Sequence, residues 1–233
     1  MPPKLPSKVD LLVISPHADD SEFGIAGTVA KMTAAGKKVA FVICTNGEKG
    51  TSDYKMDAGE LIKIREKEQR AAAKVLGVTE VTFLGFADQS LEDNDKLRKE
   101  IVRQIRIYRP STVATTDPYR RYIQHRDHRI CGQVVLDAVY PFARDHLALP
   151  DLFEQGYKPH KVREVLTWGT EDPNYWTDIT GTFEIKIKAL RCHKSQVGER
   201  AELDKWLRER ATSSGKKPGY DLAEEFHRTK IWR

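Results

Sequence analysis

His17, Asp19 and Asp20 lie close together in a segment between an apolar run and a run with helical character. Because His17 and Asp20 are three residues apart, their side chains would share one face of a first helical turn. An imidazole and a carboxylate on one face could hold two corners of a metal site, and Asp19 could reach a water on that metal. The acidic pair could instead cap a helix and interact with its dipole. These residues alone leave both interpretations open.

A second polar cluster, His125-Arg126-Asp127-His128, opens a helix predicted over residues 129–140. This cluster comes after a predicted strand over residues 112–116, and His17 likewise follows a predicted strand over residues 9–14. In open α/β sheets, ligands bind in the crevice at the carboxyl ends of the strands. We therefore expect the two clusters to share one site.

The predicted elements alternate between buried strands and amphipathic helices, which is typical of an α/β fold. Further strands are predicted over residues 39–45, 81–84 and 162–168, a strand or turn over 174–179, and helices over 25–35, 58–76, 95–108, 183–192 and 201–210. Successive strand–helix–strand units form right-handed crossovers. The order predicts a Rossmann-like three-layer fold, with a mostly parallel central sheet and an active site at the C-terminal ends of its strands.

The whole chain, residues 1–233, is expected to form a single domain. Its core would cover about residues 9–197, and a helical tail about residues 198–233, with 220–233 as a last short helix. Residues 141–161 show weak periodicity, so we expect an irregular segment that covers one side of the site.

The composition of the 233 residues is 39% hydrophobic and 31% charged, which is typical of a globular protein. No apolar run approaches the length of a membrane span, and residues 1–8 lack the apolar stretch of a signal peptide. A net charge of +5 would permit nucleic-acid binding. However, the basic residues alternate with acidic ones, which indicates a solvated surface. We therefore expect neither a membrane nor a nucleic-acid partner.

The three cysteines, Cys44, Cys131 and Cys192, are scattered and form no CxxC pair. This usage suits the reducing cytoplasm and argues against both a disulfide framework and a cysteine-based zinc site. The sequence also lacks GxGxxG, a P-loop and GxSxG, so it predicts neither a phosphate-binding loop nor a serine nucleophile.

The two histidine clusters together resemble those of the LmbE-like, or PIG-L, family of zinc-dependent N-deacetylases. Further matching segments occur in the family's order between residue 9 and about residue 197: Thr45-Asn46-Gly47-Glu48, Arg65-Glu66 with Leu76-Gly77, Asp88 in Gly85-Phe86-Ala87-Asp88, Asp178-Ile179-Thr180, and His193-Lys194-Ser195-Gln196. The resemblance implies hydrolysis of the N-acetyl group of a small N-acetylglucosamine conjugate, such as the precursors of bacillithiol and mycothiol. Several members form hexamers, so it also implies a homo-oligomer.

The resemblance assigns a metal site to the first cluster and the end of the second. His17, Asp20 and His128 match the family's zinc ligands, and Asp19 matches its general base. A catalytic zinc uses three protein ligands and keeps a position open for water, whose pKa it lowers to about 7. Zn²⁺ is therefore the expected cofactor, with Fe²⁺ as another divalent ion that suits these ligands.

The resemblance also assigns four supporting residues. His125 matches the histidine that stabilises the oxyanion or protonates the leaving amine, and Asp127 the carboxylate that orients it. Arg65 and Asp88 match positions that contact the sugar. An amide is a poor electrophile, so its hydrolysis needs both a base for water and an acid for nitrogen.

Two other functions would explain part of this pattern. A noncatalytic metal- or sugar-binding protein could use the same fold, but binding alone would not require both Asp19 and His125. A phosphoreceiver-like signalling domain would explain the acidic pair after the first strand. It would leave the paired histidine clusters unexplained.

Overall fold

The computed structural model describes residues 8–231 except residue 199. Residues 1–7, in which no signal peptide is expected, lie outside the described part. The strands are β1 (Leu11–Ser15), β2 (Val39–Thr45), β3 (Glu80–Phe86), β4 (Thr112–Thr116), β5 (Glu164–Trp168), β6 (Tyr175–Asp178) and β7 (Ala223–Lys230). The helices are α1 (Asp20–Ala34), α2 (Ala58–Val75), α3 (Asp95–Tyr108), α4 (Arg126–Asp137), α5 (Pro150–Glu154), α6 (Phe183–Leu190), α7 (Lys194–Val197) and α8 (Glu202–Gly215), with a π-helical turn, Ala138–Phe142, after α4.

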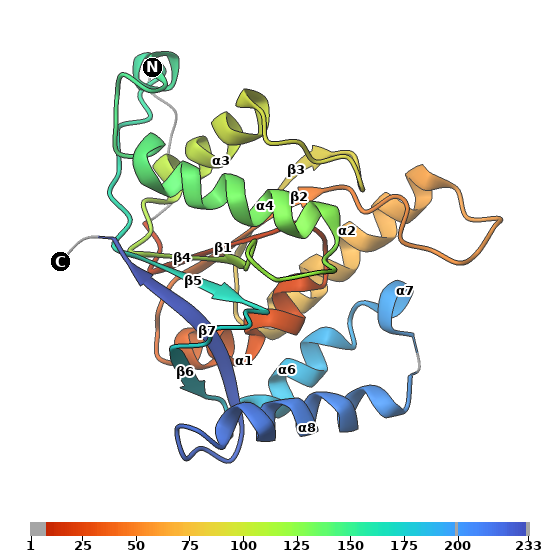
Figure 1. The fold of residues 1–233 in the computed structure, drawn as a ribbon. Coiled ribbons are helices and arrows are strands. Elements are labelled where there is room, and N and C mark those ends of the chain that lie inside the picture. Colours follow the sequence, from red (N-terminus) through yellow and green to blue (C-terminus); the bar gives the residue numbers. More distant parts are fainter. Residues whose placement is uncertain (1–7, 199, 232–233) are drawn as a thin grey trace.

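The strands form a seven-stranded sheet in the order β3-β2-β1-β4-β5-β7-β6. The five strands from β3 to β5 pair in parallel, and β7 pairs antiparallel with both β5 and β6. Helices α3 and α4 cover one face of the sheet, α1, α2 and α6 cover the other, and α8 lies outside α6 (Figure 1). The predicted three-layer α/β fold with a mostly parallel sheet is confirmed.

The central strands are apolar on both faces because helices cover both. In β1, Leu12 and Ile14 belong to the core beneath α3 and α4, whereas Leu11 and Val13 belong to the core beneath α1 and α2. All four are fully buried, as expected for a strand in the middle of a parallel sheet. Among the described residues, we find no helix that combines the length and apolarity needed to cross a bilayer.

The direction of chain progression reverses between β1 and β4. The chain passes from β1 to β2 and β3 on one side, and then returns to place β4 on the other side of β1. Such a switch point opens a crevice at the carboxyl ends of the two strands. The loops after β1 and β4 carry the two histidine clusters, so the topology brings these clusters to one crevice.

The prediction of a last helix over residues 220–233 is wrong for its described part. Residues 223–230 form β7, which lies between β5 and β6 (Figure 1). The segment has little apolar alternation, and Glu224 is buried within it. A contact remote in sequence, with Lys186, makes that burial tolerable. Residues 232–233 lie outside the described part.

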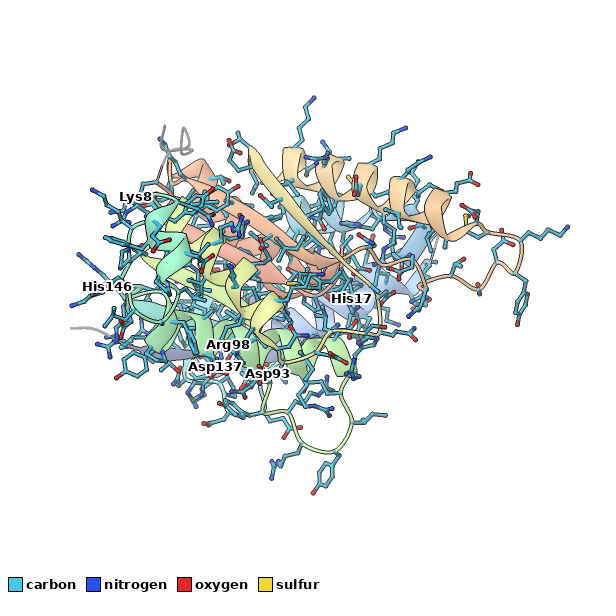
Figure 2. All side chains as sticks on the ribbon, turned by 90° about the horizontal axis from the view of Figure 1, so that it is seen from above. Lys8, His17, Asp93, Arg98, Asp137 and His146 are labelled. Carbon is cyan, nitrogen blue, oxygen red and sulfur yellow. The ribbon has the colours of Figure 1, made fainter. Side chains whose placement is uncertain are left out.

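The expectation that residues 141–161 cover one side of the site is also wrong. The buried guanidinium of Arg106 donates to the backbone carbonyls of Phe142 and Asp145, and His160 contacts the carbonyl of Pro110. These contacts hold the segment against the end of α3, before β4 begins. In Figure 2, His146 accordingly lies near Lys8 and far from His17.

Candidate active site

The turn between β1 and α1 holds Asp19 in an unusual backbone conformation. Asp19 has a φ of 89°, in the left-handed region, and α1 begins at Asp20, five residues earlier than predicted. The carboxylate of Asp19 makes no capping hydrogen bond to the helix. A non-glycine residue with positive φ is costly and is often found at functional sites. The capping interpretation therefore does not account for the Asp19 side chain.

Asp20 joins the two histidine clusters. One carboxylate oxygen, Oδ2, accepts from the backbone N–H of His17 at 3.0 Å and lies 3.2 Å from its Nδ1. The other, Oδ1, lies 3.2 Å from Nε2 of His128, although His128 follows more than 100 residues later. His17, Asp20 and His128, the set that the resemblance assigns to a metal, are thus brought together by the fold.

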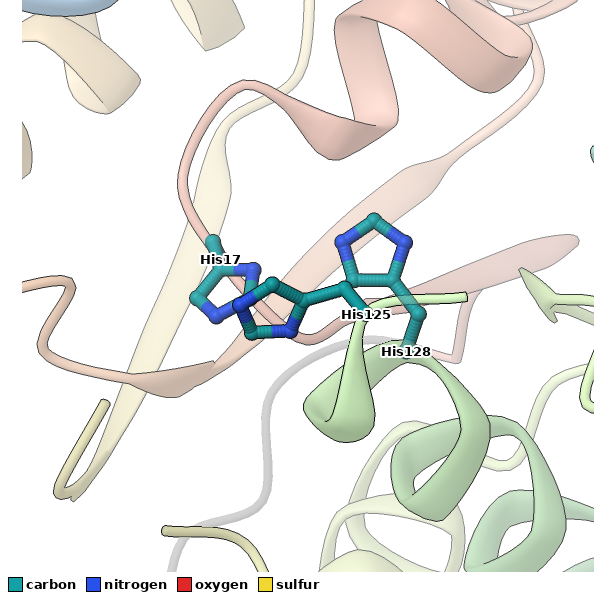
Figure 3. A group of neighbouring side chains, drawn as sticks. All are labelled: His17, His125 and His128. Carbon is teal, nitrogen blue, oxygen red and sulfur yellow. The ribbon is translucent and has the colours of Figure 1, made fainter. Parts of the chain in front are cut away.

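His125 and His128 reach His17 from the start of α4 (Figure 3). The ring centroid of His17 lies 4.8 Å from that of His125 and 5.4 Å from that of His128. Helix α4 begins three residues earlier than predicted, and His125 is its N-cap. Nδ1 of His125 accepts from the backbone N–H of Asp127 at 3.1 Å, which leaves Nε2 to carry the proton in the neutral ring.

The contact between Asp127 and His125 differs from the expected one. The Asp127 carboxylate accepts from the backbone N–H groups of Gln89 and Leu91 and lies 3.2 Å from Nε2 of His17. Only its backbone N–H bonds to His125. Because the carboxylate is fully buried and already holds three partners, it orients the loop before α3 and the ring of His17, not the ring of His125.

The buried cluster has an excess of carboxylates around His17. Its Nε2 lies 3.0 Å from Oδ1 of Asp88, an oxygen without an aligned hydrogen-bond donor. Burial lowers the pKa of His17, but the hydrogen bonds that its protonated ring donates to Asp127, Asp20 and Asp88 outweigh burial and raise that pKa to about 12. Burial raises the pKa of Asp20, but the charges and hydrogen bonds of His128 and His17 outweigh burial. The pKa of Asp20 therefore falls below its usual range.

This cluster suits a divalent cation. Two sets of donor atoms lie within 4.8 Å of one another among the described residues: His17 with His125 and His128, and His17 with Asp88 and Asp127. Asp20 adds a carboxylate between His17 and His128. Imidazole and carboxylate groups are ligands that zinc and iron accept, and a cation would offset the crowded negative charge.

Asp19 has the electrostatics of a base near neutral pH. Burial and then the neighbouring Asp20 carboxylate raise its pKa to about 7, against the opposing charge of Arg65. A general base works best when its pKa lies near the working pH. The two adjacent carboxylates therefore differ in protonation, since the pKa of Asp20 is depressed.

Arg65 is buried under this turn. Its guanidinium donates to the backbone carbonyls of Ala18 at 2.7 Å and Gly47 at 3.1 Å, and lies 3.7 Å from Oδ1 of Asp19. Only 4% of Arg65 is exposed. A Cβ on Gly47 would lie 2.5 Å from the guanidinium, so the close approach requires glycine there. These contacts hold the Asp19 turn, and the expected contact of Arg65 with a sugar stays a prediction.

Asp88 is also held by the protein. Its Oδ2 accepts from the backbone N–H of Lys49 at 3.3 Å, and its own N–H donates to the carboxylate of Glu48. Burial raises the pKa of Asp88, but its contacts with His17 lower it to about 2. The carboxylate is thus charged and faces His17, and its contact with a sugar stays a prediction.

A chain of fully buried polar side chains behind Asp19 was missed in the sequence. The backbone N–H of Asp19 donates to Oε1 of Gln69, Nε2 of Gln69 donates to Oε1 of Glu22, and Oε2 of Glu22 lies 3.3 Å from Nε2 of His193. Gln69, Glu22 and His193 are each 0% exposed. The spacing of Glu22 and Gln69 in the sequence does not indicate that they are in contact. His193 belongs to a segment that matches the family, but that match does not indicate Glu22 as its partner.

A cleft of about 460 Å³ opens beside the histidines, and most of its lining was also missed. It is bordered by Asp20, His125 and His128 and otherwise lined by Phe23, Gly24, Thr116, Arg120, Ile123, Gln124, Trp168, Gly169, Trp206 and Arg210. These residues come from five separate parts of the chain, so no local pattern could reveal them. Arg65 and Asp88 do not line this cleft.

Comparisons with known proteins agree with the geometry. The family model described as PIG-L, GlcNAc-PI de-N-acetylase, matches residues 12–139. The chain is 37% identical over 216 residues to a diacetylchitobiose deacetylase of Thermococcus kodakarensis, with 92% of this chain and 80% of that protein covered. It is 28% identical to a protein of Bacillus subtilis named probable N-acetyl-alpha-D-glucosaminyl L-malate deacetylase 2, with 86% and 90% covered.

A solved structure extends the likeness to the whole fold. The N,N'-diacetylchitobiose deacetylase from Pyrococcus horikoshii, in complex with its inhibitor MPG, superposes with a TM-score of 0.90 at 31% identity. The match covers 97% of this chain and 85% of that one. The likeness therefore includes α8 and β7, which lie beyond the residues matched by the family model.

Proposed function

This chain belongs to the PIG-L family of de-N-acetylases, and we propose that it is a zinc-dependent hydrolase that removes the acetyl group from an N-acetylglucosamine-type sugar. The family membership leaves no place for the phosphoreceiver alternative. The observation that carries the proposal is the position of Asp20 between His17 and His128, with Asp19 beside them.

His17, Asp20 and His128 would hold the metal in this proposal. Bound Zn²⁺, or another divalent ion such as Fe²⁺, would lower the pKa of a water molecule and polarise the amide carbonyl. Three protein ligands leave a coordination position for that chemistry. The buried excess of carboxylate charge around His17 supports the presence of such a cation.

Asp19 would act as the general base. A carboxylate oxygen of Asp19 would accept the proton of the attacking water, as its raised pKa allows. Arg65 and Gln69 hold the turn on which Asp19 lies, through the carbonyl of Ala18 and the N–H of Asp19. The geometry of the base is therefore fixed before substrate binds, which suits a group that acts only in the transition state.

His125, which belongs to the second histidine cluster, would act on the amide of the substrate. Burial and the charges of His17 and His128 lower its pKa, which favours the neutral ring in the absence of substrate. In that ring Nε2–H is a donor that can stabilise the oxyanion. If Nδ1 releases the N–H of Asp127 and takes a proton from solvent, the resulting imidazolium can transfer the Nε2 proton to the leaving nitrogen and return to the neutral ring. Asp127 would position His125 through its backbone N–H.

The remaining assignments are proposals that rest on the resemblance and on composition. We propose that Asp88 and Arg65 contribute to sugar binding, that residues 1–233 act as one catalytic domain, and that the protein is a cytoplasmic homo-oligomer, of which a hexamer, the form of several family members, is one candidate. The free cysteines Cys44, Cys131 and Cys192 are consistent with a reducing compartment. Size-exclusion chromatography with light scattering tests the oligomer.

Acetate release tests the function. The zinc-loaded protein should release acetate from N-acetylglucosamine and N,N'-diacetylchitobiose, and lose this activity when a chelator removes the metal. Metal binding with no acetate release from either sugar would favour the noncatalytic alternative. Equal turnover of the sugars and a simple acetamide without hydroxyls would reject the sugar specificity, although the metal chemistry would stand.

A further inference from the structure

The segment His193-Lys194-Ser195-Gln196 matches the family in sequence, yet no step of the proposed reaction uses it. We propose that Gln196 in this segment is a positioning residue for Asp19, which it supports through the loop that follows β2. This inference rests on the proposed role of Asp19 as the general base and goes beyond it by assigning a residue that keeps the base in place. Gln196 neither lines the cleft beside the histidines nor belongs to the sets of metal donors found among the described residues.

The orientation of the proposed base depends on the peptide group between Ala18 and Asp19. Its carbonyl oxygen accepts from Nη2 of Arg65 at 2.7 Å, and its N–H donates to Oε1 of Gln69 at 3.1 Å. Arg65 and Gln69 are four residues apart on α2, so both reach the turn from one face of that helix. Because the peptide is held at both of its polar atoms, the left-handed backbone conformation of Asp19 depends on where these two side chains lie.

Arg65 is in turn covered by the loop between β2 and α2. Its Nη1 donates to the carbonyl of Gly47, and the N–H of Gly50 donates to the same carbonyl at 3.4 Å. The backbone of Gly50 lies directly against the guanidinium, because a Cβ on Gly50 would lie 2.6 Å from Nη1. A displacement of Gly50 would therefore uncover Arg65 and weaken its hold on the Asp19 turn.

Gln196 holds Gly50 in this position from the other side. Its Nε2 donates to the carbonyl of Gly50 at 2.9 Å, and its Oε1 would lie 3.1 Å from a Cβ on Gly50. Gly50 is thus enclosed between the amide of Gln196 and the guanidinium of Arg65. The hydrogen bond from Gln196 therefore keeps the cover over Arg65 closed.

The segment that carries Gln196 is itself fixed to the fold. Ser195 donates through its N–H and its hydroxyl to the two carboxylate oxygens of Glu68 on α2, at 2.8 and 2.6 Å. His193 is fully buried, and Val197 packs among the apolar side chains of α6 and α8. Helix α7 consequently lies against α2 and the loop before it (Figure 1), so that Gln196 acts from a firmly packed support.

The first test removes the amide donor of Gln196. Methionine has nearly the same length and no charge, and it cannot donate to Gly50. For zinc-loaded Gln196→Met protein, we expect kcat for N-acetylglucosamine to fall about three- to tenfold, because one hydrogen bond is lost and the base is less often in its productive orientation. KM and zinc content should not change.

Two variants separate positioning from stability. Lys194→Ala changes an exposed residue of the same segment, and Leu203→Ala removes core contacts of α8. Both should keep the parent kcat, although Leu203→Ala should lower the urea midpoint of unfolding. A fall in kcat in Leu203→Ala as large as that in Gln196→Met would overturn the proposal, because general destabilisation would then explain both.

The Asp19→Asn background shows whether Gln196 acts through the base. There, Gln196→Met should lower the residual rate much less than it lowers the parent rate, since the effects of residues that act as a unit are not additive. An equal factor in both backgrounds would overturn the proposal. An increase in KM at unchanged kcat would also overturn it, because Gln196 would then act through the contact of the same loop with Asp88, made by Lys49.

Hydrogen exchange at the N–H of Asp19 is a second readout, which does not depend on turnover. This N–H is bonded to Gln69, so it should exchange slowly in the parent and in Lys194→Ala, and several-fold faster in Gln196→Met. Unchanged exchange together with unchanged kcat would overturn the positioning role and leave the deacetylase intact. Failure to release acetate from any sugar would instead reject the proposed function, and exchange at Asp19 would still decide whether Gln196 holds the turn.

Discussion

The backbone N–H of Asp19 donates a 3.1 Å hydrogen bond to Oε1 of Gln69, a fully buried side chain 50 residues away on α2. Because the amide nitrogen of Gln69 donates to Glu22 at 2.8 Å, its oxygen must face Asp19. Gln69 thus stabilises the left-handed backbone conformation of Asp19, although it has no direct part in the proposed chemistry.

Gln69→Leu should therefore slow the reaction without removing the metal. We expect kcat to fall by about tenfold or more, because a buried donor loses its partner at a cost of about 1–3 kcal/mol and the base is no longer fixed. KM and zinc content should change little. Steady-state kinetics with metal analysis tests this, and Gln104→Leu, a buried glutamine of α3 on the other side of the sheet, is the control. A kcat like that of the parent in Gln69→Leu would show that the Asp19 turn keeps its conformation without the contact with Gln69.

His128→Ala should remove most of the bound metal and leave the fold intact. His128 is only partly buried and lies at the first turn of α4, so its loss opens no core cavity. Removal of one of three protein ligands should weaken zinc binding by well over tenfold. Mass spectrometry of the metal content, with circular dichroism as the check on folding, decides the question. Full occupancy in this variant would remove His128 from the ligand set.

Removal of one partner from the buried Lys186–Glu224 pair should destabilise the fold strongly. Nζ of Lys186 lies 2.6 Å from Oε1 of Glu224 and also donates to the carbonyl of Phe23, while Glu224 accepts from the N–H groups of Gly27 and Thr28. Both side chains are about 5% exposed. Lys186→Met leaves a buried carboxylate unpaired, so unfolding in urea should show a loss of about 3–5 kcal/mol.

The exposed pair of Arg208 and Glu184 on the same side of the molecule is the control for that measurement. Arg208→Ala should cost at most about 1 kcal/mol, because solvent screens an exposed pair. Equal losses in Lys186→Met and Arg208→Ala would show that burial adds nothing to the Lys186–Glu224 pair.

These contacts also show where prediction from the sequence ends. The bounds of β2, α3 and β4 agree with the predicted ranges, because an apolar run or a helical repeat determines each of them locally. The segment that forms β7 carries Glu224 at a buried position and pairs with β5 and β6. Its conformation depends on partners remote in sequence, which no local periodicity encodes.

The same distinction applies to the candidate site. His17, Asp20 and His128 stand out because their residue types are rare and their spacing fits a metal, and the fold brings them together as expected. Gln69 and Trp206 occur in ordinary helical patterns, and only packing gives them their neighbours. The loop that Asp127 orients likewise follows from a tertiary contact, with Gln89 and Leu91.

His193 should make stability depend on pH. Burial lowers its pKa, but pairing with Glu22 outweighs burial and raises the pKa above the usual 6.5. A histidine with a raised folded-state pKa stabilises the fold fully below the unfolded pKa of about 6.5, and this contribution is lost as pH rises through the folded pKa. In urea unfolding of metal-free protein, His193→Gln should cost about 1–3 kcal/mol below about pH 6.5 and less as pH rises.

His160 provides a control of opposite sign. Burial lowers its pKa, against the opposing contact with the Pro110 carbonyl. Its neutral form is therefore favoured in the folded protein, and its contribution to stability should be present above about pH 6.5 and lost as pH falls. If the cost of His193→Gln grew with rising pH, as expected for His160, the proposed charge on His193 would be wrong.

The most direct test of the account is acetate release by zinc-loaded Asp19→Asn protein, measured together with its metal content. Asparagine cannot accept the proton of water, and general base catalysis contributes about 10²–10⁴-fold. Since His17, Asp20 and His128 are unchanged, the variant should keep its zinc and lose activity by a factor in that range. Activity within a few-fold of the parent at full zinc occupancy would contradict the account, because Asp19 would then serve only the turn into α1.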